Sequence, residues 1–167
     1  MEYARQASCV ACERRPERPF CDFPSDALRA FDAIKSFVAY PRGSTLFAEG
    51  RPPRGIFVLC DGRAKLYICS EGGKRLMLRT ASPGEVLGVS SALSGRPYEV
   101  TAEALDACKV AFVKRKELLK FLRDYREATL HLVHLLSGDL HVTYERLRSI
   151  GLSRTRRPRA SVRPGHA

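Results

Sequence analysis

No uninterrupted apolar run in the 167-residue sequence approaches the roughly 18 residues that a membrane-spanning helix requires. The first ten residues, MEYARQASCV, also lack the apolar core of a secretory signal peptide. Neither a P-loop, nor a nucleophile elbow, nor a paired-carboxylate signature is present. We therefore expect a cytoplasmic protein with no membrane partner, and we do not expect an enzyme.

Acidic residues are scarce, since 18 Asp and Glu stand against 29 Lys and Arg and the formal charge is +11. The stretch 153–167 contains five arginines and no acid. Such an excess of positive charge permits contact with the phosphates of a nucleic acid without requiring it. A short arginine-rich end is more often solvated, so we predict a basic disordered tail over 153–167.

The middle of the chain has the pattern of short strands. Hydrophobic residues make up 44% of the sequence, which is enough for a core. Between residues 37 and 113, nine glycines separate short apolar stretches. No helix-length segment interrupts them, so a parallel α/β sheet is disfavoured and a small antiparallel sandwich or jelly roll of seven or eight strands is predicted.

Helical periodicity flanks this β region on both sides. Leu28, Phe31 and Ile34 recur at helical spacing after Ser25, which is the expected N-cap of a short helix. A second short helix is expected over 114–125 and a long one over 126–152. The predicted fold class is therefore mainly β with α, an antiparallel jelly roll between a short N-terminal helix and a long C-terminal helix.

The long helix carries a heptad of mostly apolar residues, a pattern typical of a helix that pairs with its own copy. The two lines of the heptad are Val133, Leu140, Leu147 and Leu136, Thr143, Ile150. The alternative is that the stripe packs on the β domain. Because neighbouring positions such as Leu132 and Leu135 are apolar too, both contacts are compatible with the pattern, and we expect a homodimer.

Three motifs resemble the Crp/Fnr family of bacterial transcription regulators. They are a Gly-x-x-Leu-Phe-x-x-Gly pattern over 43–50, the stretch GIFVLCDGRAKL at 55–66 and PGEVLG at 83–88. The resemblance covers about residues 9–152. It implies a cyclic nucleotide-binding-like β-roll over 25–124, after a cysteine-rich segment over 1–24, and a dimerisation helix over 125–152.

Members of the resembled family continue into a DNA-binding helix-turn-helix. Here fifteen residues follow Leu152, which are too few to bury such a core. We therefore expect a sensor and dimerisation module that meets DNA only within a full-length relative or a heterodimer. Two alternatives stay open: a stand-alone module that binds a small ligand, and a partner that blocks DNA binding by full-length relatives.

The resemblance also suggests where a cyclic nucleotide would bind. In relatives that bind one, a Gly-Glu pair begins the loop and short helix around the ribose and phosphate, and an Arg followed by Ser or Thr neutralises the phosphate. Gly84 and Glu85 match the first pair, but Tyr98 and Glu99 occupy the second, and Arg96 is followed by proline. Because a carboxylate would repel the phosphate, we expect cyclic nucleotide binding to be disfavoured.

Three of the six cysteines, Cys9, Cys12 and Cys21, lie close together near the N-terminus. In oxygen-sensing members of the resembled family, cysteines at this place and one more from the β-roll hold a [4Fe–4S] cluster. Cys108 lies nearest to the position of that further ligand, although strand alternation favours a core location for Cys108 and for Cys60. A cluster, a zinc ion or redox-active dithiol, and inert thiols are the alternatives.

The charge around these thiols bears on their reactivity. Arg14, Arg15 and Arg18 lie between the cysteines, and we expect them to lower the pKa of the thiols. Cys69 alternates with Lys65 and Tyr67 on a strand and is expected to be more exposed.

Overall fold

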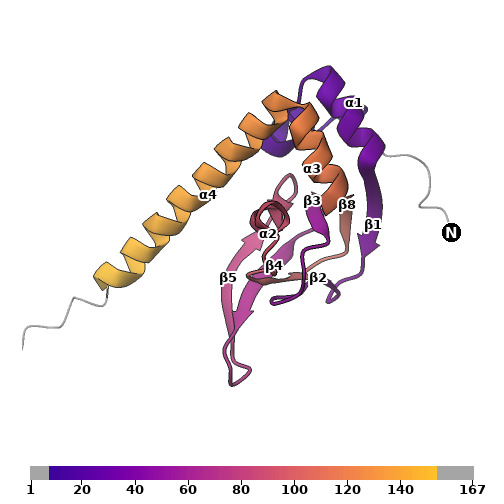
Figure 1. The fold of residues 1–167 in the computed structure, drawn as a ribbon. Helices are drawn as coiled ribbons and strands as arrows, with labels where there is room; N and C mark the ends of the chain where they lie inside the picture. The colour runs from indigo at the N-terminus through magenta and orange to yellow at the C-terminus, as the bar shows by residue number, and fades with distance from the viewer. Residues whose placement is uncertain (1–7, 154–167) are drawn as a thin grey trace, which may run out of the picture.

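The computed structural model describes residues 8–153, and in them two antiparallel sheets of four strands face each other (Figure 1). The strand orders are β1-β8-β3-β6 and β2-β7-β4-β5. This arrangement confirms the predicted antiparallel β-roll with flanking helices. The strands are β1 (Lys35–Tyr40), β2 (Thr45–Phe47), β3 (Gly55–Asp61), β4 (Ala64–Cys69), β5 (Arg75–Ala81), β6 (Val86–Leu87), β7 (Thr101–Ala104) and β8 (Cys108–Lys114).

The helices gather at one end and on one side of the roll (Figure 1). They are α1 (Ser25–Ile34), α2 (Val89–Ser94), α3 (Arg115–Asp124) and α4 (Arg126–Ser153), preceded by the 3₁₀ turns η1 (Arg15–Glu17) and η2 (Pro19–Cys21). Ser25 is the first residue of α1 and not its N-cap. Pro24 holds that position, and no side chain caps the helix.

The strand β3 is buried on both faces, which explains its unbroken apolar stretch. Phe57 and Leu59 point into the roll, between the two sheets. Ile56 and Val58 point to the outer face of the β1-β8-β3-β6 sheet, where a second core lies. The helices α1, α3 and the first turns of α4 cover that outer core.

The N-terminal segment is part of the outer core. In the sequence it precedes every predicted core element, and we expected it to be separate from the β-roll. Phe20 and Phe23 are buried, and the Phe20 ring lies 5.5 Å from that of Phe31 on α1. The Phe23 ring lies 5.7 Å from that of Phe121 on α3. Since the segment has no helical or strand periodicity, its apolar residues gave no pattern from which this docking could be predicted.

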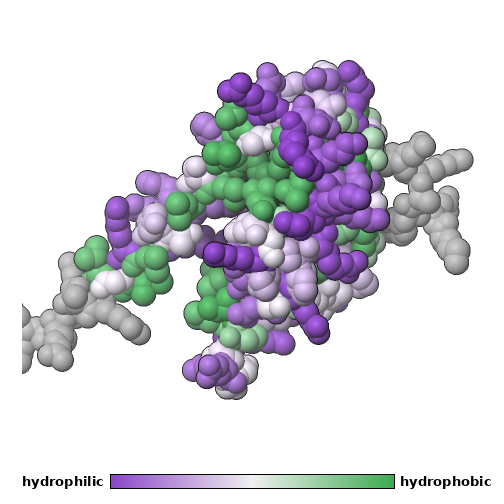
Figure 2. All heavy atoms as spheres, in the orientation of Figure 1, coloured by the Kyte–Doolittle hydropathy of each residue, from purple (hydrophilic) through white to green (hydrophobic). Residues whose placement is uncertain are grey.

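The long helix α4 divides into two parts. Ala128 and Leu132, which lie beside the heptad, are buried against the domain, whereas Val133 of the heptad is 52% exposed. Beyond them α4 extends away from the roll, and Leu140 and Leu147 are 53% and 59% exposed. Figure 2 shows apolar side chains on this outer part of α4 and on β5.

Two further expectations from the sequence concern the basic C-terminal tail and membrane-spanning helices. The predicted basic tail lies, from residue 154 onward, outside the described residues. No helix within residues 8–153 has the length and apolar character needed to cross a bilayer.

Candidate functional site

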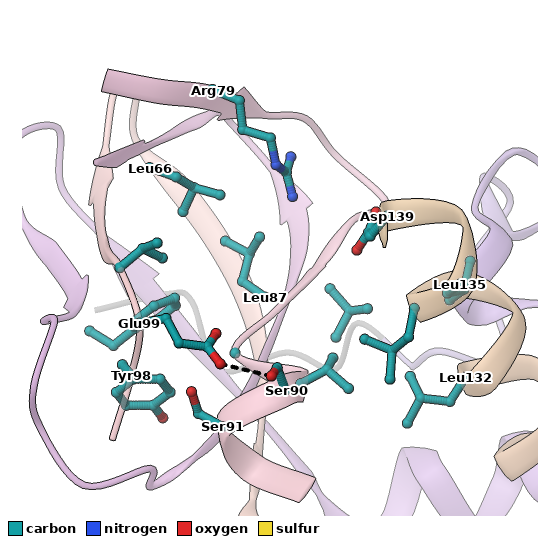
Figure 3. Close-up of a pocket in the computed structure, with 16 residues that line it drawn as sticks. Leu66, Arg79, Leu87, Ser90, Ser91, Tyr98, Glu99, Leu132, Leu135 and Asp139 are labelled. Atoms are coloured by element: carbon teal, nitrogen blue, oxygen red, sulfur yellow. Dashed lines mark hydrogen bonds between the residues drawn. The ribbon is translucent and has the colours of Figure 1, made fainter. Parts of the chain in front are cut away.

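A cavity of about 130 Å³ lies between the β-roll and α4 (Figure 3). Leu132, Leu135 and Asp139 line it from α4, and Arg79 reaches into it from β5. The Ser90 hydroxyl of α2 donates a hydrogen bond to the Glu99 carboxylate at 2.8 Å on the same cavity wall. We call this space the β-roll pocket.

Gly84 and Glu85 do not begin the short helix, as the resemblance implied they would. The helix α2 starts at Val89, after Gly88 with a φ of +80°, and the strand β6 separates it from the Gly-Glu pair. The Glu85 carboxylate instead accepts hydrogen bonds from the Arg79 guanidinium and from the Ser82 backbone amide. Glu85 is therefore already partnered, and the residue that follows the helix-starting glycine carries no charge.

Tyr98, in the place where the resemblance calls for an arginine, is a structural residue. It is buried, and its hydroxyl accepts hydrogen bonds from the backbone amides of Arg54 at 3.0 Å and Gly55 at 3.2 Å. The same hydroxyl donates to the Gly55 carbonyl at 2.9 Å. Arg96 is exposed and does not line the β-roll pocket.

Tyr98→Phe is expected to lower the free energy of unfolding by about 1–3 kcal/mol, because the buried Gly55 backbone loses its partner. Chemical denaturation followed by circular dichroism measures the change. The matched control is Tyr144→Phe, since the Tyr144 ring is exposed on α4. Equal stability of the two variants would show that the Tyr98 hydroxyl is dispensable.

A larger cavity, of about 340 Å³, lies between the N-terminal segment and the outer face of the β1-β8-β3-β6 sheet. Four cysteines line it: Cys9, Cys12, Cys21 and Cys60. All four are free thiols. We call this space the cysteine cavity. It brings together the three predicted N-terminal ligands and adds Cys60 of β3, which the sequence assigned to an inert core.

Cys108 does not line the cysteine cavity. It is buried in the interior of the roll, where its thiol donates to the carbonyls of Arg63 at 3.2 Å and Asp106 at 3.3 Å. On the same strand it is Ala111, three residues later, that lines the cysteine cavity. Because strand side chains alternate between faces, Cys108 and Ala111 point in opposite directions, so Cys108 is not placed as a ligand.

The profile of the family described as Cyclic nucleotide-binding domain matches residues 37–125. The chain belongs to this family. A CRP-like cAMP-activated global transcriptional regulator of Mycobacterium tuberculosis is 26% identical over 110 residues, which are 66% of this chain and 49% of the relative. The transcriptional activator protein anr of Pseudomonas aeruginosa is 26% identical over 142 residues, 81% of this chain and 55% of the relative.

The catabolite activator protein of Thermus thermophilus has the same fold, with a TM-score of 0.71 at 20% identity over 80% of this chain and 62% of that one. The chain spans about half the length of the curated relatives it matches. These matches confirm the Crp/Fnr resemblance and the expectation that the domain is not an enzyme. They do not support the expectation against a cyclic nucleotide, because one of the relatives is named as cAMP-activated.

In this cyclic nucleotide-binding domain, the cysteine cavity has an excess of positive charge. Arg14, Arg18 and Lys109 line it, against the single carboxylate of Asp61. Arg18 is only 6% exposed, and its guanidinium donates to the Cys60 carbonyl at 2.5 Å. No carboxylate within residues 8–153 forms an ion pair with Arg18. Since a buried cation is costly without a counter-charge, the cavity suits an anion.

Burial raises the pKa of three thiols of the cysteine cavity, contrary to the expectation that the nearby arginines lower it. Burial raises the pKa of Cys9 to about 12 and that of Cys21 to about 11, and it also raises the pKa of Cys60. Arg18 acts in the expected direction on Cys21 and Cys60, but burial outweighs it. Cys69 is exposed, as predicted.

The arrangement of the four thiols bears on which metal group they could hold. Among the residues that the structure describes, no three His, Cys, Asp or Glu side chains are placed to hold one metal ion. A tetrahedral zinc site would need its sulfur atoms about 2.3 Å from one metal. A [4Fe–4S] cluster binds each thiolate through a different iron, so its ligands surround a larger volume. The four thiols around a cavity of about 340 Å³ therefore fit a cluster better than zinc.

Proposed function

We propose that this domain is the sensor and dimerisation part of a Crp/Fnr-type transcriptional regulator, and that it senses oxidants through a [4Fe–4S] cluster in the cysteine cavity. The observation that carries the proposal is the set of thiols from Cys9, Cys12 and Cys21 around a cavity with unbalanced positive charge. When bound, such a cluster supplies one-electron and oxygen chemistry. The chain's own residues provide the thiolates, the buried cation and the apolar walls.

A direct contact links the cysteine cavity to the long helix. The turn η2 ends with Cys21, and its Pro19 carbonyl is hydrogen-bonded to the His131 imidazole of α4. The Phe23 ring also lies 5.7 Å from the His131 ring. A change in the position of Cys21 on gain or loss of a cluster would therefore be felt by α4. We call the heptad side chains of the outer part of α4, Leu140, Thr143, Leu147 and Ile150, the seam, and we propose that this surface changes its contacts when the cluster is gained or lost.

Oxygen-free purification tests the cluster directly. We expect about four irons and four sulfides per chain and an absorbance band near about 400 nm. The variant Cys9→Ser, Cys12→Ser should lose all three signals, whereas the control Cys69→Ser should keep them, since Cys69 is exposed and away from the cysteine cavity. Equal iron in the double variant and the wild type, or zinc in place of iron, would refute the proposed cluster.

The proposed dimer predicts the effect of charges in the heptad of α4. Leu140→Glu combined with Leu147→Glu should weaken self-association by about a hundredfold or more, because two apolar contacts become buried like charges. Analytical ultracentrifugation measures the dissociation constant. The control variant His134→Glu, His141→Glu introduces the same two glutamates one residue after Val133 and Leu140 of the heptad. It should leave the dimer intact, because these positions do not belong to the heptad. A monomeric wild-type protein, or equal weakening by both pairs, would contradict the dimer.

A cyclic nucleotide in the β-roll pocket is a second candidate, favoured by the match to the Cyclic nucleotide-binding domain family and by Arg79 on the pocket wall. Two carboxylates, of Glu99 and Asp139, line the same pocket, and Glu85 already pairs with Arg79. The volume is also below the roughly 300 Å³ at which small-molecule pockets begin. Calorimetry with cyclic AMP decides: saturable heat that Arg79→Met abolishes would establish this site.

A further inference from the structure

Cys60 stands at an irregularity in the pairing of β3 with β8. Leu59 pairs with Val110 and Asp61 with Lys109, so Cys60 is the extra residue of a β-bulge. Bulges bend a strand and re-aim a side chain, and they are frequent beside functional sites. Here the bulge falls where β3 passes the N-terminal segment, and Cys60 lines the cysteine cavity.

Cys60 is the common neighbour of the three N-terminal cysteines. The four thiols line one cavity, to which the N-terminal segment contributes Cys9, Cys12 and Cys21 and β3 contributes Cys60. A positive group placed among them, which is what a metal cluster supplies, would favour their thiolate form.

The buried guanidinium of Arg18 fixes the backbone at this place. It donates to the Cys60 carbonyl at 2.5 Å, and its aliphatic part packs against Gly84, where a Cβ would lie 2.9 Å from the Arg18 Cγ. Arg18 thus ties the N-terminal segment to the bulge of β3. The cavity's three cations and one carboxylate leave an excess of two positive charges, which balances the charge of about −2 of a [4Fe–4S] core with four thiolates.

The other cysteines of the β-roll are not available to the cysteine cavity. Cys108 lies in the roll interior with two backbone carbonyls as partners. Cys69 is exposed at the end of β4, in the opposite sheet. Cys60 is thus the one β-roll thiol, among all six cysteines of the described chain, that meets the N-terminal three.

We infer that Cys60 on β3, and not a cysteine of β8, is the fourth thiolate ligand of the cluster, so that the cluster fastens the N-terminal segment to a central strand of the sheet. This assignment rests on the proposed function. It places the β-roll ligand at the bulge, held in position by Arg18.

Four single variants, Cys9→Ser, Cys60→Ser, Cys69→Ser and Cys108→Ser, purified without oxygen, test the assignment. Iron and sulfide content, visible absorbance and electron paramagnetic resonance are the readouts. We expect Cys60→Ser and Cys9→Ser to lose the cluster or to retain only about three irons, with the resonance of an oxidised three-iron cluster. Cys69→Ser and Cys108→Ser should keep the wild-type iron content.

The outcomes separate this assignment from the proposed function. Loss of iron in Cys9→Ser and Cys108→Ser, with full iron in Cys60→Ser, would overturn Cys60 as ligand and leave the cluster in place. No iron in the wild type would overturn both. Thermal melting of the metal-free proteins, followed by circular dichroism, tests whether the variants fold. Because Cys60 is only partly buried, Cys60→Ser and Cys60→Ala should have the same melting temperature as the metal-free wild type. Cys60→Ala must then lose iron as well.

Discussion

Phe31→Ala is expected to lower the free energy of unfolding by about 3–5 kcal/mol, the range for truncating a buried aromatic side chain. Phe31 is 1% exposed and lies at the centre of the outer core. Its ring centroid is 5.5 Å from that of Phe20, 5.7 Å from that of Phe23 and 5.8 Å from that of Phe121. One truncation therefore removes contacts to the N-terminal segment and to α3 together.

Urea denaturation of the metal-free protein measures the Phe31→Ala effect, and Leu76→Ala is the control. Leu76 is an apolar side chain of β5 that is 59% exposed, so its truncation should change stability by less than about 0.5 kcal/mol. The Phe31→Ala variant should also be cleaved faster by protease within residues 8–24, since the aromatic contacts hold that segment. A loss below about 1 kcal/mol would show that the N-terminal segment is not part of the cooperative core.

The β-roll was predictable because local patterns determine it. The glycines between short apolar stretches mark turns, and the buried β3 appears as the run Ile56–Leu59. The long helix was predictable from its heptad. These features depend on neighbours in sequence, and the two sheets bury the strand faces that the apolar pattern defines.

The cysteine cavity could be predicted only in part. Alternation correctly put Cys60 on the face of Ile56 and Val58. It could not tell that the aperiodic N-terminal segment covers that face, because docking of such a segment is a tertiary effect. The Asp61-Gly62 pair directly after Cys60 is the signal that could have indicated a bulge or turn, since Gly62 has a φ of +78°.

The start of the short helix α2 could not be predicted from the glycine motif alone. Gly84 and Gly88 are four residues apart, and both have positive φ angles. Only the structure shows that α2 follows Gly88 and begins at Val89 instead of at the Gly84-Glu85 pair. From the sequence, the carboxylate of Glu85 is expected at the start of the short helix, where the structure has the apolar Val89. An apolar side chain there cannot bond to a ribose hydroxyl, and this weakens the case for a cyclic nucleotide in the β-roll pocket.

The strand β3 links the two cavities. At its start, the Gly55 amide and carbonyl are both bonded to the Tyr98 hydroxyl beside the β-roll pocket. At its end, Cys60 lines the cysteine cavity. Because the strand is buried on both faces, we expect a displacement at one end to be passed along the strand and not absorbed locally.

Gly55→Ala tests how tightly that strand is held, and we expect a loss of about 3 kcal/mol or more. A Cβ on Gly55 would lie 2.0 Å from the Val113 carbonyl oxygen and 2.9 Å from its carbon. Both atoms belong to the backbone of β8, so no side-chain rotation relieves the overlap. The two strands must move apart, and the movement also breaks the hydrogen bonds between Gly55 and Tyr98.

The matched control is Gly72→Ala, because the nearest atom to its added Cβ is the Ser70 hydroxyl at 3.9 Å and the position needs no positive φ. That variant should differ from the wild type by less than about 0.5 kcal/mol in urea denaturation. Since Gly55→Ala already disrupts the Tyr98 hydroxyl, adding Tyr98→Phe should cost less than the sum of the single losses. Strict additivity, or a stable Gly55→Ala variant, would mean that β3 and β8 adjust independently of Tyr98. The strand could then not carry a change from the cysteine cavity to the β-roll pocket.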